Sequence, residues 1–317
     1  MKERVTYIDN LKAFAIICVI LGHALQYLAG NDPERLISFN LIYTFHMPLF
    51  MMISGFFAAP SLRLAPNVFL KKKAKQLLLP AISWSIIKII LSAGGNVCNN
   101  LSGSFWFLKS AFVCYVVTYV MTRIVRKDSI AYAILFIIPL FCNIDISTYM
   151  LNYMLPSFIF GIWLKQNIDY IIRNRVLIIC VSLLIYSVLL PFWHFNEFHY
   201  TSVWQNGTFS ADNFLIAIHR IALGLSGSLL LFTTFSYINR ASAIVSSIGA
   251  STLGLYVMNG IFSDIQRHIM LLNIGNEFAC IAISLLLVAI QIPVFMLIIN
   301  YMKRLRFVST IFLGTTK

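Results

Sequence analysis

The chain has 317 residues, of which 59% are hydrophobic and 11% are charged, and its mean hydropathy is +0.83. Soluble domains carry roughly 25% charged residues, so this composition excludes a soluble globular protein and indicates a polytopic membrane protein. The net charge of +13 does not indicate nucleic-acid binding. Lysine and arginine gather in short runs between apolar stretches, which is the pattern that orients membrane helices.

Apolar stretches long enough to cross a bilayer, at about 20 residues per span, recur along the whole chain. They lie at 11–29, 36–59, 76–95, 105–122, 129–144, 149–164, 176–193, 214–236, 245–266 and 278–302. We therefore predict an all-α, polytopic transmembrane bundle of about ten spans, forming one integral membrane domain over residues 1–317. Asp9 and Lys12 interrupt the basic and then apolar start, so we expect an uncleaved first span rather than a signal peptide.

Positive charge falls on every second loop between these stretches. One set of loops carries Lys2, Arg4, Arg63, Lys71, Lys72, Lys73, Lys75, Arg123, Arg126, Lys127, Lys165, Arg173, Arg175, Arg240, Lys303, Arg304, Arg306 and Lys317. The alternate set holds little beyond Arg35 and Arg267. Because positive loops stay in the cytoplasm, we predict that both termini are cytoplasmic.

The first stretch contains ionisable residues on one helical face. Lys12 and His23 are eleven positions apart, about three turns with ~20° of drift, so they point the same way roughly 16 Å apart along the axis. Asp9 precedes Lys12 by three residues and can pair with it. Ionisable groups cost several kcal/mol inside a bilayer unless they face a polar interior, so this face predicts a functional site. A lone hydrogen-bonded interhelical histidine is the alternative.

The second stretch adds a further histidine. His46 is followed by Pro48, which breaks the local helix and frees backbone carbonyls, a feature tolerated only beside protein or a polar cavity. Ser54 and Gly55 then allow another helix to approach closely. Two histidines and an Asp/Lys pair in neighbouring helices favour a site. No His, Asp, Glu or Cys cluster has metal-ligand spacing, so we expect no metal.

Several motifs, in chain order, resemble the membrane acyltransferase-3 family, whose members O-acetylate cell-surface glycans. They are Asp9-Asn-Leu-Lys12-Ala followed by His23, Phe45-His-Met-Pro-Leu-Phe…Ile53-Ser-Gly-Phe56, the basic segment Phe69–Lys75 with Leu79-Pro80, Phe105-Trp-Phe-Leu108, Phe158-Ile-Phe-Gly161 and Ile248–Asn259. The first basic residue is often arginine in the family and is Lys12 here, which gives a point charge rather than a bidentate fork. The late motif often ends in histidine and here ends in Asn259, which does not shuttle protons near neutral pH.

The resemblance implies transfer of an acetyl group from acetyl-CoA, as donor, to a sugar hydroxyl of a surface polysaccharide or its lipid-linked precursor. It also implies that the protein lies in the bacterial cytoplasmic (inner) membrane. His23 would be the general base or a transient acyl carrier. Asp9 and Lys12 would orient the entry of the site or screen the donor's charge. His46 would donate to the acceptor, assist the base or hold a helix kink, and these three roles stay open.

Further residues are assigned to substrate and donor binding. We predict that the basic residues Arg63, Lys71, Lys72, Lys73 and Lys75 attract the phosphates of coenzyme A, although positive-inside charge and attraction to anionic membrane lipids explain such a loop equally well. The predicted substrate-binding residues are Ser54, Trp106, Lys109, Tyr256 and Asn259, with Trp106 and Lys109 at an outer-side pocket or, for Trp106, in ordinary packing. Arg220 and Asp264 are expected to form a structural ion pair.

The alternative function is transport across the membrane. A transporter or flippase for a lipid-linked sugar or small solute would also use intramembrane charges, broken helices and a basic cytoplasmic face. Transporters tend to show repeated halves, and the Asp9–His23 pattern has no second copy, which favours the enzyme. A membrane receptor or scaffold leaves the two histidines and Pro48 without a role.

Overall fold

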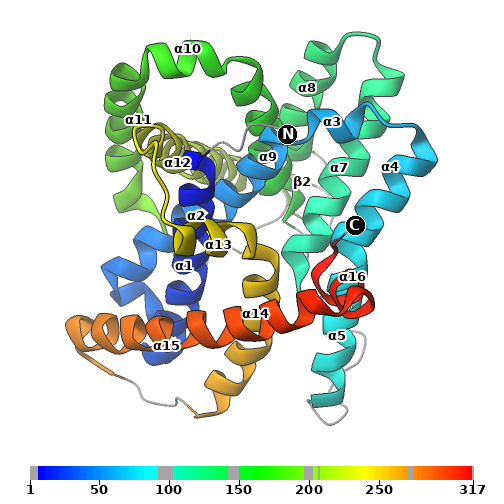
Figure 1. The fold of residues 1–317 in the computed structure, drawn as a ribbon. Helices are drawn as coiled ribbons and strands as arrows, with labels where there is room; N and C mark the ends of the chain where they lie inside the picture. The colour runs from blue at the N-terminus through cyan, green and yellow to red at the C-terminus, as the bar shows by residue number, and fades with distance from the viewer. Residues whose placement is uncertain are drawn as a thin grey trace.

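The computed structural model describes residues 6–91, 101, 103–141, 150–195, 203–205, 208–269 and 274–315, with the backbone alone for 204–205 and 264–269. Within these ranges the protein is a bundle of helices, which confirms the predicted all-α class (Figure 1). The exception is a short antiparallel ribbon in which β1 (Trp204–Gln205) pairs with β2 (Thr208–Phe209).

Helices make up nearly all of the described chain. In chain order they are α1 (Thr6–Leu28), η1 (Pro33–Arg35), α2 (Ile37–Phe56), α3 (Ala59–Leu62), α4 (Pro66–Lys73), η2 (Ala74–Leu78), α5 (Leu79–Leu91), α7 (Trp106–Ile124), α8 (Asp128–Ile137), η3 (Ile138–Leu140), α9 (Leu151–Gln166), α10 (Ile168–Arg173), α11 (Arg175–Leu189), η4 (Leu190–Phe192), α12 (Ala211–Phe235), α13 (Ala243–Ala250), α14 (Thr252–Ile269), α15 (Glu277–Arg304) and α16 (Arg306–Leu313). The element η2 is a single π-helical turn, and it joins α4 to α5.

Seven continuous helices in the described ranges are long and apolar enough to cross a membrane. An eighth is added if α13 and α14, which meet at 69°, form one broken span. The helix over Asp128–Leu140 is shorter, and α9 has 16 residues. Each predicted apolar stretch contains a helix, but the number of crossings and the cytoplasmic side of the termini stay predictions.

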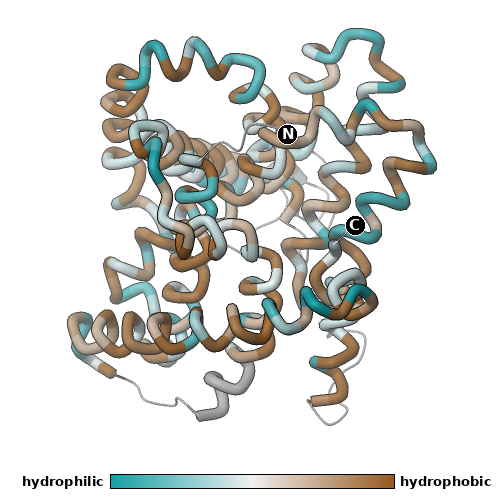
Figure 2. The backbone as a smooth tube through the Cα atoms, viewed as in Figure 1, coloured by the Kyte–Doolittle hydropathy of each residue, from teal (hydrophilic) through white to brown (hydrophobic). Residues whose placement is uncertain are grey.

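The helices divide into an inner and an outer group. The inner helix α1 packs against α2, α12, α13, α14 and α15, and its side chains Leu11, Ala15 and Ile16 are fully buried. The outer helices α11 and α15 instead expose large apolar side chains, including Leu184 and Leu297, as a lipid-facing surface does. Hydrophilic segments gather around α10 and the turn between α7 and α8 (Figure 2).

Two glycines bring α2 and α9 into direct backbone contact. A Cβ atom on Gly55 would lie 1.8 Å from the carbonyl oxygen of Phe158, and one on Gly161 would lie 1.9 Å from that of Met52. Small residues at such crossings let membrane helices approach closely. The close approach predicted at Ser54 and Gly55 is therefore confirmed, and the partner helix is α9.

Pro48 lies inside α2 without ending it. A proline removes the N–H that would otherwise bond the carbonyl four residues earlier, which here belongs to Thr44. The Tyr153 hydroxyl of α9 donates to that carbonyl oxygen at 3.1 Å. The predicted break in the helix is therefore wrong, because α9 supplies the missing donor. The prediction that Pro48 frees a backbone carbonyl, and that this carbonyl lies beside protein, is confirmed at Thr44.

Candidate functional site

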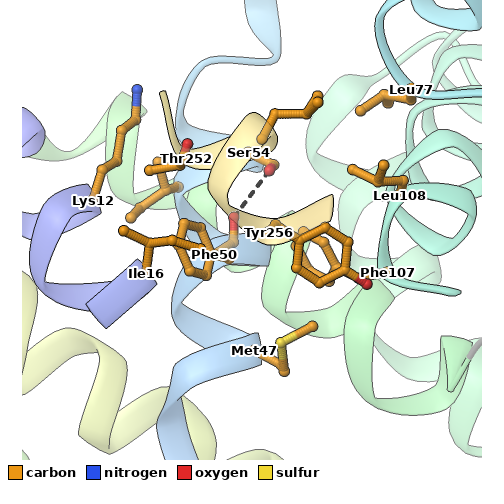
Figure 3. Close-up of a pocket in the computed structure, with 12 residues that line it drawn as sticks. Lys12, Ile16, Met47, Phe50, Ser54, Leu77, Phe107, Leu108, Thr252 and Tyr256 are labelled. Atoms are coloured by element: carbon orange, nitrogen blue, oxygen red, sulfur yellow. Dashed lines mark hydrogen bonds between the residues drawn. The ribbon is translucent and has the colours of Figure 1, made fainter. Parts of the chain in front are cut away.

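A cavity of about 160 Å³ lies between α1, α2, η2, α7 and α14. We call it the Lys12 cavity (Figure 3), and its lining is Lys12, Ile16, Met47, Phe50, Ile53, Ser54, Leu77, Phe107, Leu108, Thr252, Leu253 and Tyr256. Lys12 is the one formally charged side chain in this lining, and the other polar side chains are hydroxyls. The structure therefore brings three predicted site residues together: Lys12, Ser54 and Tyr256.

Lys12 lies in the first turns of α1 and extends beside Thr252 at the edge of the cavity (Figure 3). Its ammonium nitrogen is 4.9 Å from the ring centroid of Phe57, within the range of a cation–π contact. The rest of the lining is mainly aromatic and aliphatic, so a negative ligand group near Lys12 would interact in a poorly hydrated setting. Electrostatic attraction is stronger there than in bulk water.

A second lysine is connected to the cavity wall through Tyr115. The Lys73 ammonium lies 3.5 Å from the ring centroid of Tyr115, and Lys73 is only 6% exposed. The Tyr115 hydroxyl donates to the backbone carbonyl oxygen of Ser54 at 2.9 Å. The π-helical turn η2 begins immediately after Lys73 and contributes Leu77 to the cavity lining. Such turns occur frequently at functional sites.

The other members of the predicted donor-binding group lie elsewhere. Lys71 and Lys75 are exposed and Lys72 is half-buried on the outer sides of α4 and η2. Arg63 lines a separate cavity, together with Arg123 and Lys165. The structure thus brings only Lys73 of this group to the wall of the Lys12 cavity, and donor binding by the other four residues stays a prediction.

The two histidines belong to one cluster between α1 and α2. His46 stacks edge-on against Tyr43 at a centroid distance of 4.9 Å, and the Tyr43 hydroxyl donates to Gln26 Oε1 at 2.7 Å. The His23 ring lies nearly parallel to the Tyr27 ring, with the ring centroids 6.4 Å apart. His23 precedes Gln26 by three residues and so shares its face of α1. His23 is half-buried, whereas His46 is 5% exposed. His23 is therefore the more accessible imidazole.

The protonation pattern of His46 follows from its hydrogen bond. His46 Nδ1 lies 2.7 Å from the carbonyl oxygen of Ile42. A carbonyl only accepts, so Nδ1 carries the proton and Nε2 is the acceptor of the neutral ring. This bond fixes the tautomer and the ring orientation, as second partners of functional histidines do.

The Lys12 cavity and the histidine cluster are consecutive along the same two helices. On α1, Lys12 and Ile16 line the cavity, and His23 continues that face two turns further, roughly 10 Å along the axis. On α2, Met47 lines the cavity and His46 is its direct neighbour. A ligand that enters the cavity at Lys12 and follows α1 would approach His23.

Asn259 lies one turn beyond Tyr256 on α14 and is 1% exposed. Its Oδ1 atom has no hydrogen-bond donor among the residues that the structure describes. A buried polar atom without a partner costs about 1–3 kcal/mol, and a substrate hydroxyl or a bound water would remove that cost. Asn259 thus supplies an acceptor at the position where the late motif often has histidine.

Trp106 and Lys109 do not line the Lys12 cavity, although Phe107 and Leu108 between them do. The Lys109 ammonium donates to the backbone carbonyls of Leu101 and Ser104, so it fastens the segment that precedes α7. Trp106 packs against the main hydrophobic core. Their substrate-binding roles stay predictions.

Asp9 is 8% exposed and lies where α13 meets α1, since a Cβ on Gly249 would come within 2.3 Å of its carbonyl oxygen. Its predicted pairing with Lys12 stays a prediction. The Arg220 guanidinium lies 5.1 Å from the ring centroid of Tyr153, but the side chain of Asp264 is outside the described residues. In the described part of the chain, no three His, Cys, Asp or Glu side chains gather closely enough to hold a metal ion.

Sequence reasoning missed Tyr43, Gln26 and Tyr27 in the histidine cluster and Tyr115 beside Lys73. A signal for two of them was present, because Gln26 and Tyr27 follow His23 by three and four residues and share its helical face. Tyr43 precedes His46 by three residues on α2 in the same way. Tyr115 had no comparable signal, because its role depends on the packing of α7 against η2.

Comparisons with known proteins identify the family of the chain. A family model described as an acyltransferase domain, acyltransferase-3, matches residues 5–301. The chain is similar to the nodulation protein NolL of Mesorhizobium japonicum, with 29% identity over 96% of this chain and 89% of that protein. It is also similar to NolL of Sinorhizobium fredii, with 27% identity over 77% of this chain and 67% of that protein. No solved structure gives a significant match.

Proposed function

Because the chain belongs to the membrane acyltransferase-3 family, whose model matches almost all of it, we propose that it transfers an acetyl group from acetyl-CoA to a sugar hydroxyl. The acceptor we propose is a surface polysaccharide or its lipid-linked precursor, and the location is the bacterial inner membrane. Acyl transfer as the activity class follows from family membership. Membership also favours the enzyme over the transporter or flippase.

The observation that carries the proposal is the succession of the Lys12 cavity and the histidine cluster along α1 and α2. Acetyl-CoA carries phosphates at one end and a thioester at the other, joined by a narrow chain. Lys12 offers a positive charge at one end of the cavity, and Lys73 lies behind its wall. His23 lies two turns beyond the cavity, where the thioester would arrive.

The chemistry assigned to the cluster is general base catalysis. The sugar hydroxyl gives its proton to His23, and its oxygen attacks the thioester carbonyl carbon. The carbon–sulfur bond then breaks, and the departing coenzyme A thiolate takes the proton back from the imidazolium. The products are the acetyl ester and free coenzyme A. His46, held by Ile42, presents Nε2 as an acceptor that orients the hydroxyl or assists His23.

The first test is donor binding by thermal shift in detergent. A ligand that binds only the native state stabilises it by about 2.7 kcal/mol at a hundred times its Kd. We expect acetyl-CoA to raise the melting temperature of the wild type and of Lys127→Ala, whose side chain is exposed at the start of α8. Lys12→Ala is expected to lose most of this shift. No shift in folded wild-type protein at saturating acetyl-CoA would overturn the assigned donor.

The second test is the transfer itself. Wild-type membranes supplied with acetyl-CoA labelled in the acetyl group are expected to form a labelled glycan or lipid-linked glycan that releases acetate in mild base, as an ester does. His23→Ala membranes containing equal amounts of folded protein are expected to form about 10²–10⁴-fold less in the same time. Label found equally in both would contradict the assigned site.

A further inference from the structure

A second cavity, of about 410 Å³, lies where the ends of α2, α3, α7, α8 and α9 meet. We call it the Arg63 cavity, and its lining is Gly55, Phe56, Ala59, Leu62, Arg63, Thr122, Arg123, Asp128, Tyr132, Ile162, Lys165 and Gln166. Ser54 and Gly55 are adjacent in α2 but line different cavities. The Arg63 cavity therefore lies on a different face of α2 from the Lys12 cavity.

Three cations and one carboxylate line the Arg63 cavity. The cations are Arg63, Arg123 and Lys165, and the carboxylate is Asp128. In the described ranges, no carboxylate oxygen lies within 4.0 Å of the charged nitrogens of these three cations. The lining therefore carries a net charge of +2, which an anion would balance.

Aromatic rings and backbone groups hold two of these cations in place. The Arg123 guanidinium lies 4.9 Å from the ring centroid of Tyr119 and donates to the Leu64 carbonyl oxygen at 3.3 Å. The Lys165 ammonium lies 5.0 Å from the ring centroid of Phe56. Cation–π contacts leave the N–H donors of both groups able to bind a further acceptor. Phosphate oxygens match such donors well.

The same helix ends carry exposed apolar side chains. Ile124, next to Arg123, is 70% exposed, and Trp163, two residues before Lys165, is 43% exposed. Tryptophan is enriched at membrane–water interfaces, where its apolar ring and its N–H meet both phases. An exposed tryptophan and an exposed isoleucine beside the cations are typical of helix ends at the depth of lipid headgroups.

We propose that the Arg63 cavity binds the phosphate group of an anionic phospholipid from the surrounding leaflet. Basic pockets between the ends of membrane helices bind such headgroups through charge and hydrogen bonds. The bound phosphate would bridge α7 and α9 through Arg123 and Lys165 and would neutralise their mutual repulsion. This lipid binding does not depend on acyl transfer, so its test is independent of the test of the proposed enzyme activity.

The test measures the thermal stability of the whole protein in uncharged detergent with four additives. They are short-chain phosphatidylglycerol, phosphatidylcholine with the same chains, inorganic phosphate and coenzyme A. We expect phosphatidylglycerol to raise the melting temperature, and phosphatidylcholine and inorganic phosphate to leave it unchanged or to raise it far less. Coenzyme A is expected to raise it only through the Lys12 cavity, so its effect should be lost in Lys12→Ala. Coenzyme A added with phosphatidylglycerol should not remove the lipid's effect.

Variants decide whether the cavity is responsible. Arg63→Gln with Arg123→Gln, and separately Lys165→Gln, are expected to weaken the apparent affinity for phosphatidylglycerol at least tenfold. The matched control is Arg304→Gln with Arg306→Gln, which removes two exposed positive charges at the α15–α16 junction and should respond like the wild type. Lys165→Gln removes no backbone hydrogen bond that Arg123 makes, so it remains informative if the double variant is unfolded.

Four outcomes would overturn the proposal. An equal effect of phosphatidylcholine would mean that the headgroup charge is irrelevant. An equal loss in the control variant would mean that the lipid senses only total surface charge. A full effect of inorganic phosphate would identify a free-phosphate site, and competition by coenzyme A would assign the cavity to the acyl donor.

Discussion

The two cavities share α2 and α7 but place positive charge in opposite settings. In the Lys12 cavity a single ammonium stands among aromatic and aliphatic side chains, and a second one is buried behind the wall against Tyr115. In the Arg63 cavity three exposed cations face a carboxylate and several polar side chains. Attraction weakens in water and is screened by salt. Each cation should therefore matter more in the Lys12 cavity, whereas binding in the Arg63 cavity should be spread over several residues and depend on salt.

The largest expected effect is the loss of turnover when His23 is replaced. His23 is assigned to the chemical step next to the Lys12 cavity, whereas the Arg63 cavity is assigned to binding alone. Removing a general base typically costs 10²–10⁴-fold in rate. We expect His23→Ala to lower kcat by about that factor while the thermal shifts with acetyl-CoA and with phosphatidylglycerol persist. The measurement is kcat for labelled acetyl transfer, alongside both shifts.

A control distinguishes the two roles open to His23. Wild-type protein exposed to acetyl-CoA without acceptor is examined by intact-protein mass spectrometry. A stable mass gain of one acetyl group, absent in His23→Ala, would identify His23 as a transient acyl carrier. Unchanged turnover in His23→Ala would show that His23 is not catalytic. It would also leave no evidence that catalysis takes place beside the Lys12 cavity rather than elsewhere.

Lys12 should show the next largest effect, on donor affinity. Hydrogen bonds to charged groups contribute about 1.5–3 kcal/mol, which corresponds to roughly 10–150-fold in affinity. We expect Lys12→Ala to weaken acetyl-CoA binding by about that factor, and Lys12→Arg to retain most of it. Binding titrations at two salt concentrations check the comparison. A salt dependence at the Lys12 cavity as steep as that at the Arg63 cavity would contradict it.

Gly55 tests the close contact of α2 with α9 beside the Arg63 cavity. A methyl group there would meet the backbone of Phe158, which moves only if α9 shifts. Overpacking of this kind costs typically 1–3 kcal/mol, so we expect Gly55→Ala to lower the melting temperature clearly. Gly103→Ala is the matched control, because a Cβ there would meet nothing within 4 Å. Equal melting temperatures for the two variants would show that the close contact is not required.

Patterns along one helix can be predicted from the sequence, whereas contacts between distant helices cannot. The shared face of Lys12 and His23 follows from helix geometry alone, and Gly55 signals a close helix approach because it lacks a side chain. Neither pattern names the partner, so Gly161 and α9 emerge only in the fold. The length of the apolar stretches predicts the helices, because about 20 residues are needed to cross a bilayer. The helix break predicted at Pro48 is wrong, because Tyr153, more than a hundred positions away, donates to the carbonyl that the proline leaves free.

The basic segment shows where sequence reasoning stops. Lys71, Lys72, Lys73 and Lys75 are spread over about 200° around a helix, so their spacing does not distinguish the buried lysine from the exposed ones. Lys73 turns inward because Tyr115 on α7 offers its ring there. Lys109 shows the same dependence, since its donors are taken by backbone carbonyls that precede α7. Charge type is visible in the sequence, but the groups that surround each charge are set by tertiary packing.

The smallest expected effect comes from Tyr115, which links Lys73 to the cavity wall. Tyr115→Phe keeps the ring under the Lys73 ammonium but removes the hydroxyl that donates to the Ser54 carbonyl oxygen. A neutral hydrogen bond contributes about 0.5–1.5 kcal/mol, so we expect acetyl-CoA affinity to fall by roughly tenfold at most and phosphatidylglycerol binding to stay unchanged. Tyr115→Leu removes the ring as well and should weaken the donor further. Equal losses in both variants would show that the ring contact with Lys73 contributes nothing, and that the buried lysine does not act through the Lys12 cavity.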